Sequence, residues 1–137
     1  MSARSKARKR ALDVLFSAEL RGESPVEALD RVTTDGPAPT NDYTGVLVHG
    51  VAEHRSRIDE ILTQYSRDWT LERMPTVDRN VLRLGVYELV FAEDIPDQVA
   101  VSEAVELVRD LSTDDSPAFV SGVLSAILRD KPLAGQP

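Results

Sequence analysis

Five cationic side chains crowd the N-terminus of this sequence, in a ten-residue segment that contains no acid. They are Arg4, Lys6, Arg8, Lys9 and Arg10. The whole chain of 137 residues has 16 Lys or Arg against 23 Asp or Glu and a formal charge of −7, so everything after this tip is strongly acidic. Clustered cations bind phosphates, and such a charge reversal is typical of a protein that meets nucleic acid at one end. The alternative is a tip that only adds solubility, and charge alone does not separate the two.

The strength of this electrostatic contact follows from the number of phosphates that the tip neutralises. For single-stranded nucleic acid, each neutralised phosphate contributes about −0.7 to the slope of log affinity against log salt concentration. All five cations together therefore predict a slope of about −3.5, and a fourfold rise in salt then weakens binding roughly 100-fold.

Two phenylalanines stand where a ring could stack on an unpaired base. Lys9 and Phe16 are seven residues apart, nearly two helical turns, so both lie on one side of the first helix. A cation beside an aromatic ring suits single-stranded RNA, which is bound by phosphate contact and base stacking. Phe119 falls at the edge of its helix's apolar face. The alternative is that each ring completes the core. Ser116, just before Phe119, is expected to cap that helix and to offer its hydroxyl to a phosphate or base.

The residues that could carry catalysis do not form a recognisable site. His49 and His54 are five apart, about 140° around a helix, and cannot face one metal ion together. His49 and Glu53 are four apart and could, but a solvated pair is the simpler interpretation. The sequence has no cysteine, no glycine-rich phosphate loop and no G-x-S-x-G or H-E-x-x-H motif. We predict no enzyme, no metal and no cofactor.

Composition places the chain among soluble globular proteins. It is 42% hydrophobic and 28% charged, which excludes a disordered polyelectrolyte, and no apolar run approaches the ~20 residues of a membrane span. Its length predicts one domain over residues 1–137, with a basic tip at 1–10 and a flexible tail at 132–137. The absence of cysteine and of a signal peptide favours the cytoplasm.

Apolar residues recur at three- and four-residue spacing throughout, so the expected fold class is all-α with about seven helices around one core or two adjoining ones. Local signals predict a capping box at Ser24, and glycines that permit close helix contact at positions 85 and 122. The predicted helices cover residues 3–21, 25–31, 41–65, 69–73, 77–92, 98–111 and 116–130. Arg79 and Arg83, one turn apart, are expected to pair with acids such as Asp78 or Glu88 across helices; RNA contact is the alternative.

Three stretches of the sequence resemble the NusB family of bacterial transcription antitermination factors. The most specific contains Pro96, Val99, Ala100, residues 103–107, residues 114–116, Phe119, Val120 and residues 122–124. The middle stretch contains residues 77–79, 81–83 and 87–89, and the first contains Arg8, Ala11, Leu15 and Phe16. The likeness covers nearly the whole chain and is weakest over residues 23–41.

The resemblance implies a regulator that binds the boxA element of nascent ribosomal RNA together with NusE, a ribosomal small-subunit protein. The complex would join RNA polymerase and let it pass terminators. The implied fold is two adjoining small helical bundles. By motif position, the RNA side would include the basic tip, Phe16, Asp115, Ser116 and Phe119. Glu72 and Asp78 match positions that meet NusE, where acids suit a basic ribosomal protein.

Two other classes compete with this interpretation. A helical protein–protein adaptor or homodimer without specific RNA binding is favoured by the acidic body, which repels RNA except near the tip. An RNA methyltransferase with a NusB-like N-terminal domain is disfavoured by length, because no α/β cofactor domain follows residue 137.

Overall fold

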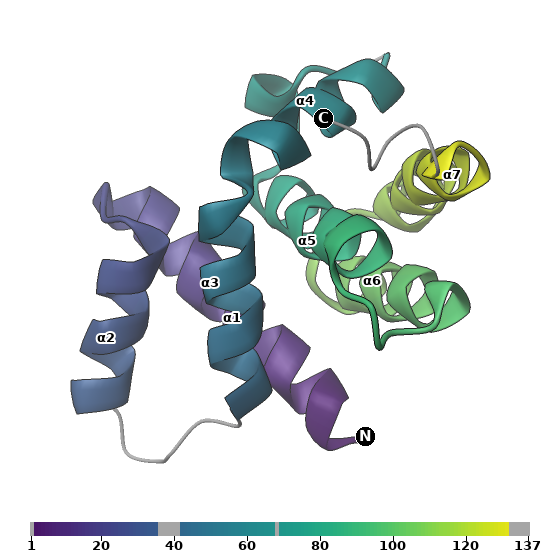
Figure 1. The fold of residues 1–137 in the computed structure, drawn as a ribbon. Coiled ribbons are helices and arrows are strands. Elements are labelled where there is room, and N and C mark those ends of the chain that lie inside the picture. The colour runs from purple at the N-terminus through teal and green to yellow at the C-terminus, as the bar shows by residue number, and fades with distance from the viewer. Residues whose placement is uncertain (1, 36–41, 68, 132–137) are drawn as a thin grey trace. The chain divides into compact units, whose positions relative to one another are not determined.

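The structure, a computed structural model, describes residues 2–35, 42–67 and 69–131. These residues form seven α-helices (Figure 1). No described residue lies in a β-strand. The chain divides into two compact units, Met1–His54 and Arg55–Pro137. The all-α fold class and the number of helices are therefore confirmed. The predicted tail, residues 132–137, lies outside the described residues.

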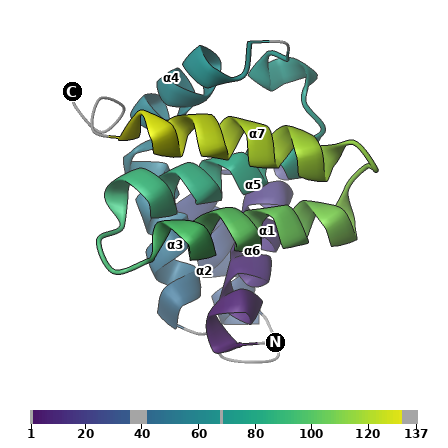
Figure 2. The ribbon, with the colours of Figure 1, turned by 90° about the vertical axis from the view of Figure 1, so that its right-hand side faces the viewer.

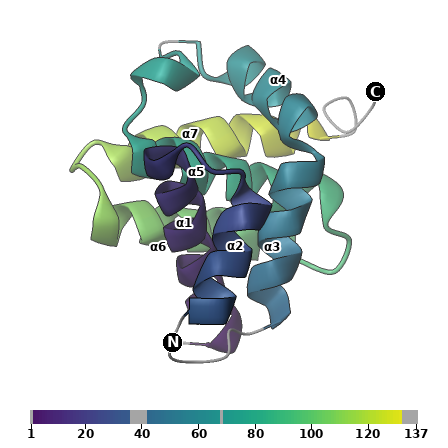
Figure 3. The same cartoon turned by 90° about the vertical axis from the view of Figure 1, so that its left-hand side faces the viewer.

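The first unit is a three-helix bundle. Its helices are α1 (Ala3–Arg21), α2 (Pro25–Asp35) and α3 (Asp42–Glu53), and each packs against the other two (Figure 3). The apolar residues of α1 that recur at three- and four-residue spacing are buried, and Ala11 and Val14 are nearly inaccessible to solvent. Buried Leu47 and Val51 complete the core from α3.

The boundaries of α1 follow from local chemistry. Ser2 caps its start by accepting a hydrogen bond from the Ser5 N–H at 3.0 Å. Gly22 ends it in the left-handed conformation at φ 70°, and the Glu23 N–H donates to the Ala18 carbonyl at 2.9 Å. Both ends lie where the sequence predicts them.

Helix α2 begins with the predicted capping box. The Glu27 N–H donates to Ser24 Oγ at 3.1 Å, and the Ser24 N–H donates to Glu27 Oε1 at 3.3 Å. Arg31 then ties α2 to α1, because its guanidinium donates to the Glu23 carboxylate at 3.0 Å and to Ser17 Oγ at 2.8 Å. The helix runs to Asp35, one turn beyond the predicted residue 31.

The long third helix predicted over residues 41–65 is two helices in the structure. Helix α3 ends at Glu53 and α4 (Arg55–Tyr65) begins two residues later, at the boundary between the two units. His54 still donates its N–H to the Gly50 carbonyl at 3.0 Å, and no proline marks the break. The apolar spacing continues across it, which is why periodicity alone predicts one helix.

The second unit contains the remaining helices: α4, α5 (Thr76–Val86), α6 (Asp97–Leu111) and α7 (Ser116–Arg129), with a 3₁₀ turn η1 (Leu71–Arg73) before α5 and a π-helical segment η2 (Tyr87–Phe91) after it. Helices α6 and α7 lie side by side, and both pack on α5 (Figure 2). In η2 the Ala92 N–H donates to the Tyr87 carbonyl, five residues back, at 3.0 Å. The core is formed by fully buried side chains of Ile58, Ile61, Leu62, Val81, Leu82, Leu89, Leu124 and Ile127.

The two helix glycines of this unit differ in their surroundings. A Cβ on Gly85 would lie 2.9 Å from Leu124 Cδ1, so α5 and α7 approach closely there, as predicted. A Cβ on Gly122 would meet nothing within 4 Å. The prediction that Gly122 permits a close helix contact is wrong, because Gly122 is on the exposed side of α7.

Polar contacts also join helices within the second unit. The Arg83 guanidinium, whose side chain is 5% exposed, donates to Asp59 Oδ1 at 2.9 Å and to Asp59 Oδ2 at 3.3 Å. Arg83 is thus structural, as expected, although its partner on α4 is not one of the predicted acids. Tyr65 Oη donates to Asp130 Oδ2 at 3.1 Å. Burial, and then this hydrogen bond, raise the pKa of Tyr65 above its usual 10.0.

Candidate nucleic-acid interface

The basic tip is the first turns of α1, and its five cations are not equally accessible. Arg4, Lys6 and Lys9 are exposed and Arg10 is half-buried. Arg8 is only 3% exposed. Since phosphates are reached from solvent, the first four side chains form the accessible part of the predicted RNA contact. We refer to Arg4, Lys6, Lys9 and Arg10 as the accessible tip.

Arg8 lies beside the aromatic ring of Tyr43, which is not among the predicted site residues. Its guanidinium carbon lies 5.7 Å from the centroid of the Tyr43 ring, and that of Arg4 lies 4.6 Å from the same centroid. Cations within about 6 Å of a ring centroid are attracted to it. Tyr43 therefore helps to join the start of α1 to α3, and Arg8 has a partner within the first unit. Nothing in the sequence spacing reveals it, because the residues lie on different helices.

Phe16 is half-buried on α1, and Lys9, two turns before it, is exposed. The ring is thus in part a core residue, as the alternative to RNA contact expects, while some of its surface stays accessible. A stacking role for Phe16 remains a prediction.

Ser116 lies in a chain of hydroxyl groups at the start of α7. Its hydroxyl donates to Ser112 Oγ at 3.1 Å, and the Ser112 hydroxyl donates to Asp78 Oδ1. The Thr113 N–H donates to Ser116 Oγ at 3.2 Å, and the Thr113 and Ser116 hydroxyl oxygens are 2.8 Å apart. Ser116 is 1% exposed. Its side chain fixes the loop between α6 and α7.

The prediction that Ser116 is the N-cap of the last helix is wrong. Asp115 occupies that position without a side-chain capping bond, and Ser116 is the first helical residue, followed by Pro117. A capping hydroxyl accepts a hydrogen bond from an N–H of its own helix. The Ser116 hydroxyl instead accepts from the Thr113 N–H in the preceding loop. A direct RNA contact by Ser116 stays a prediction and would require the loop to open.

Phe119 and Asp115 lie near this buried chain but reach the surface. Asp115 is exposed and Phe119 is half-buried. The Phe119 ring packs edge-to-face against Trp69, with ring centroids 5.1 Å apart and planes at 87°. Trp69 follows α4 and was not among the predicted site residues. Its residue type is the one signal that could have pointed to it, since tryptophan is the largest stacking surface among the side chains.

The two acids expected to meet a protein partner have different environments. Glu72 is exposed on η1. Asp78 is 0% exposed, and its Oδ2 has no hydrogen-bond donor among the described residues. A partner cannot touch Asp78 in this conformation. Its role in partner binding therefore remains a prediction, and would act through Ser112 and the loop that the carboxylate holds.

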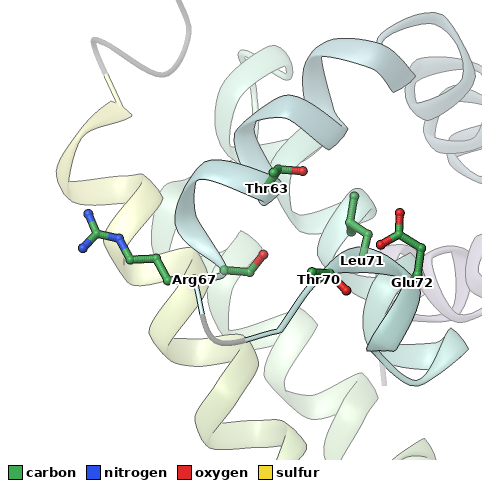
Figure 4. Close-up of a pocket in the computed structure, with 6 residues that line it drawn as sticks. Thr63, Arg67, Thr70, Leu71 and Glu72 are labelled. Atoms are coloured by element: carbon green, nitrogen blue, oxygen red, sulfur yellow. The ribbon is translucent and has the colours of Figure 1, made fainter.

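A pocket of about 210 Å³ opens beside Glu72, between the end of α4 and η1 (Figure 4). Thr63, Thr70 and Glu72 face it from different sides, whereas the Arg67 guanidinium extends away from it (Figure 4). Hydroxyls beside a carboxylate suit a small cationic group. Because Glu72 lines the pocket, a partner that binds Glu72 would also meet these hydroxyls.

The predicted RNA residues are divided between the two units: the basic tip and Phe16 in the first, Asp115, Ser116 and Phe119 in the second. Within the described residues, no three His, Asp or Glu side chains are grouped to hold a metal ion, and His49 and Glu53 are simply exposed. No helix of the described chain is both long and apolar enough to cross a bilayer.

Comparison with known proteins gives one consistent result. The NusB family profile matches residues 5–129. The transcription antitermination protein NusB of a Nocardioides species is 67% identical over 132 residues, which are 96% of this chain and 98% of the relative. That of Saccharopolyspora erythraea is 58% identical over 129 residues, 93% of this chain and 87% of the relative.

Solved structures agree with the sequence relatives. The T. maritima NusB structure superposes with a TM-score of 0.84 at 32% identity, covering 95% of this chain and 93% of that one. A structure described as the antitermination factors NusB and NusE in complex with dsRNA gives 0.83 at 34% identity, covering 95% and 98%. With nearly the whole length matched in sequence and in fold, this chain belongs to the NusB family.

Proposed function

We propose that this protein is a non-enzymatic transcription antitermination factor of the cytoplasm, which binds boxA-type single-stranded RNA together with NusE. The observation that carries the proposal is the 67% identity to a NusB antitermination protein over 96% of the chain. The related structure that contains NusB and NusE with dsRNA supports NusE and RNA as partners, and the single-stranded boxA form of the RNA is what the resemblance implies. As the resemblance implies, the assembly then joins RNA polymerase and carries it past terminators during ribosomal RNA synthesis.

Charge gives the two partners separate sites on the protein. The accessible tip attracts phosphates, and Phe16 and Phe119 offer partly exposed rings for bases. Glu72 and its pocket attract a basic protein such as NusE. RNA that binds both proteins at once is held by two weaker contacts, whose combined affinity exceeds that of either.

One observation favours a second function. The residues after the tip carry 11 cations against 23 acids, and this charge repels RNA. A helical adaptor or a homodimer would use the acidic residues after the tip for protein contacts. The tip would then serve solubility alone.

A fluorescence anisotropy titration separates the two functions. A labelled boxA oligonucleotide and a scrambled one of equal length are titrated with the protein, with and without purified NusE. The antitermination factor is expected to prefer boxA, and NusE is expected to enlarge that preference. Equal affinity for both oligonucleotides in the presence of NusE would favour the adaptor, and sedimentation of the free protein would then show whether it is a homodimer.

A further inference from the structure

The turn that carries Glu72 is too short to hold its own shape. It is η1, a single 3₁₀ turn of three residues, Leu71–Arg73, which lies between α4 and α5. The Arg73 and Met74 N–H groups donate to the Thr70 carbonyl at 3.0 and 3.2 Å. One isolated turn fixes several backbone dihedral angles for few hydrogen bonds, so it needs support from outside itself.

The guanidinium of Arg79, near the start of α5, supplies such support. Its Nη1 donates to the Leu71 carbonyl at 2.6 Å and to the Met74 carbonyl at 3.2 Å, and its Nη2 donates to Thr76 Oγ1 at 3.4 Å. Hydrogen bonds from a charged donor are roughly twice as strong as those between neutral groups. Arg79 therefore ties the first residue of η1, and the residue that follows the turn, to α5.

The same turn presents Glu72 to the pocket beside it. Thr70, Leu71 and Glu72 line the pocket from η1 and its N-cap, and Thr63 lines it from α4 (Figure 4). Glu72 is exposed, so its carboxylate is open to a partner, while the half-buried Arg79 bonds the backbone of the turn. A carboxylate on a fixed backbone loses less conformational freedom when a cation binds it than one on a loose turn.

We propose that Arg79 is a positioning residue of the partner site, which holds η1 so that Glu72 can accept a cationic side chain of NusE. This inference rests on the proposed function, in which Glu72 meets NusE. The charge of Arg79 itself repels a basic partner. Its contribution to binding therefore comes from the position of Glu72.

Positioning and charge predict opposite effects of removing Arg79. Since a cation repels a basic partner, the electrostatic effect of Arg79→Met alone is faster association and tighter binding. Loss of the position of Glu72 weakens binding instead. Arg73, which is exposed on η1, gives a matched control, because Arg73→Met removes the same charge from the turn and leaves the bonds of Arg79 to the Leu71 and Met74 carbonyls in place.

A double-mutant cycle tests whether Arg79 acts through Glu72. The affinity for purified NusE is measured by biolayer interferometry for the unchanged protein, Arg79→Met, Glu72→Gln and the double variant. Glu72→Gln should weaken binding about tenfold and Arg79→Met about three- to tenfold. In the Glu72→Gln background, Arg79→Met should change the affinity by less than about twofold, because no carboxylate is left to position. Arg73→Met should bind as tightly as the unchanged protein, or more tightly.

Amide hydrogen exchange reports on the turn without the partner. In Arg79→Met, exchange should quicken at Arg73 and Met74 more than at the core residues of α7, because the turn is loosened locally. A variant that is only less stable as a whole would exchange faster throughout. Circular dichroism checks that each variant folds. If Arg79→Met does not, Arg79→Gln takes its place in the cycle, and its loss of affinity should likewise disappear in the Glu72→Gln background.

Four results would overturn the positioning role and leave the proposed function intact. They are undiminished NusE affinity of folded Arg79→Met, equal weakening by Arg79→Met with and without the Glu72 carboxylate, equal weakening by Arg73→Met, and unchanged exchange at Arg73 and Met74. If the unchanged protein does not bind NusE, with or without boxA RNA, the proposed function and the positioning role fall together.

Discussion

Replacing one buried and one exposed cation of the tip by the same uncharged residue tests how the structure apportions phosphate contacts. Arg8 and Lys9 are neighbours in sequence, yet Arg8 is 3% exposed beside Tyr43 and Lys9 is exposed. Methionine has a similar length and no charge. If phosphates are neutralised from solvent, Lys9→Met removes a contact and Arg8→Met does not.

The magnitude follows from the number of accessible cations. The four cations of the accessible tip predict a salt slope of about −2.8 on single-stranded RNA, in place of about −3.5 for all five. A fourfold rise in salt then weakens binding about 50-fold. Lys9→Met should reduce the slope by about 0.7, whereas Arg8→Met should leave it unchanged. Arg8→Met should instead destabilise the first unit by about 0.5–2 kcal/mol, through its lost contact with Tyr43.

The assay is an anisotropy titration with boxA RNA and NusE at four or five salt concentrations between 50 and 200 mM, with urea denaturation of each variant alongside. Deletion of residues 1–10 gives the slope without any tip contact. Equal slope changes for Arg8→Met and Lys9→Met would refute the assignment of Arg8 to the interior. An unchanged slope in the deletion variant would refute the electrostatic contact as a whole.

Three further predictions concern stability, each measured by urea denaturation. Gly85→Ala should destabilise the protein by about 1–3 kcal/mol, because the added methyl group overpacks against Leu124. Gly122→Ala adds a methyl group in open space and should stabilise the protein by up to about 1 kcal/mol. Equal effects of the two substitutions would contradict the difference in helix approach. Asp59→Ala removes the carboxylate that accepts two bonds from the buried Arg83 guanidinium and should cost about 1–3 kcal/mol. This cost should exceed that of Arg83→Met, which leaves behind an Asp59 carboxylate that is 28% exposed and still paired with Arg55; the reverse order would contradict this pairing. The pKa of Tyr65 is raised in the folded state, so the contribution of its neutral hydroxyl to folding stability is complete below pH 10 and is lost as pH rises through the folded pKa. Tyr65→Phe should therefore lose less stability than the unchanged protein on going to alkaline pH. The same dependence of stability on pH in both proteins would contradict this role of Tyr65.

Several features that local sequence determines could be predicted, although the N-cap of α7 and the break between α3 and α4 could not. The ends of α1 depend on a capping serine and on a glycine in the left-handed conformation, both visible within a few residues. The capping box of α2 is likewise a short-range signal. Apolar spacing located the buried faces because helix periodicity is a property of the segment itself.

Features that depend on contacts between residues far apart in the sequence could not be predicted from local patterns. Arg8 is buried next to the ring of Tyr43, which lies on another helix. The Ser116 hydroxyl turns to the preceding loop, where it donates to Ser112, whose own hydroxyl donates to Asp78. The contact between Trp69 and Phe119 likewise joins residues far apart in the sequence. For the candidate nucleic-acid interface, the residue types and the family positions could be predicted from the sequence. Which of these side chains are accessible to solvent could not.

Transcription through a terminator tests the central claim most directly. A template with boxA upstream of a terminator is transcribed by purified bacterial RNA polymerase with NusE and the other Nus factors, with and without this protein. Readthrough should rise when the protein is added, and the rise should disappear when boxA is scrambled. Readthrough that stays the same on adding the protein, or that rises equally on the scrambled template, would contradict its role as a boxA-dependent antitermination factor.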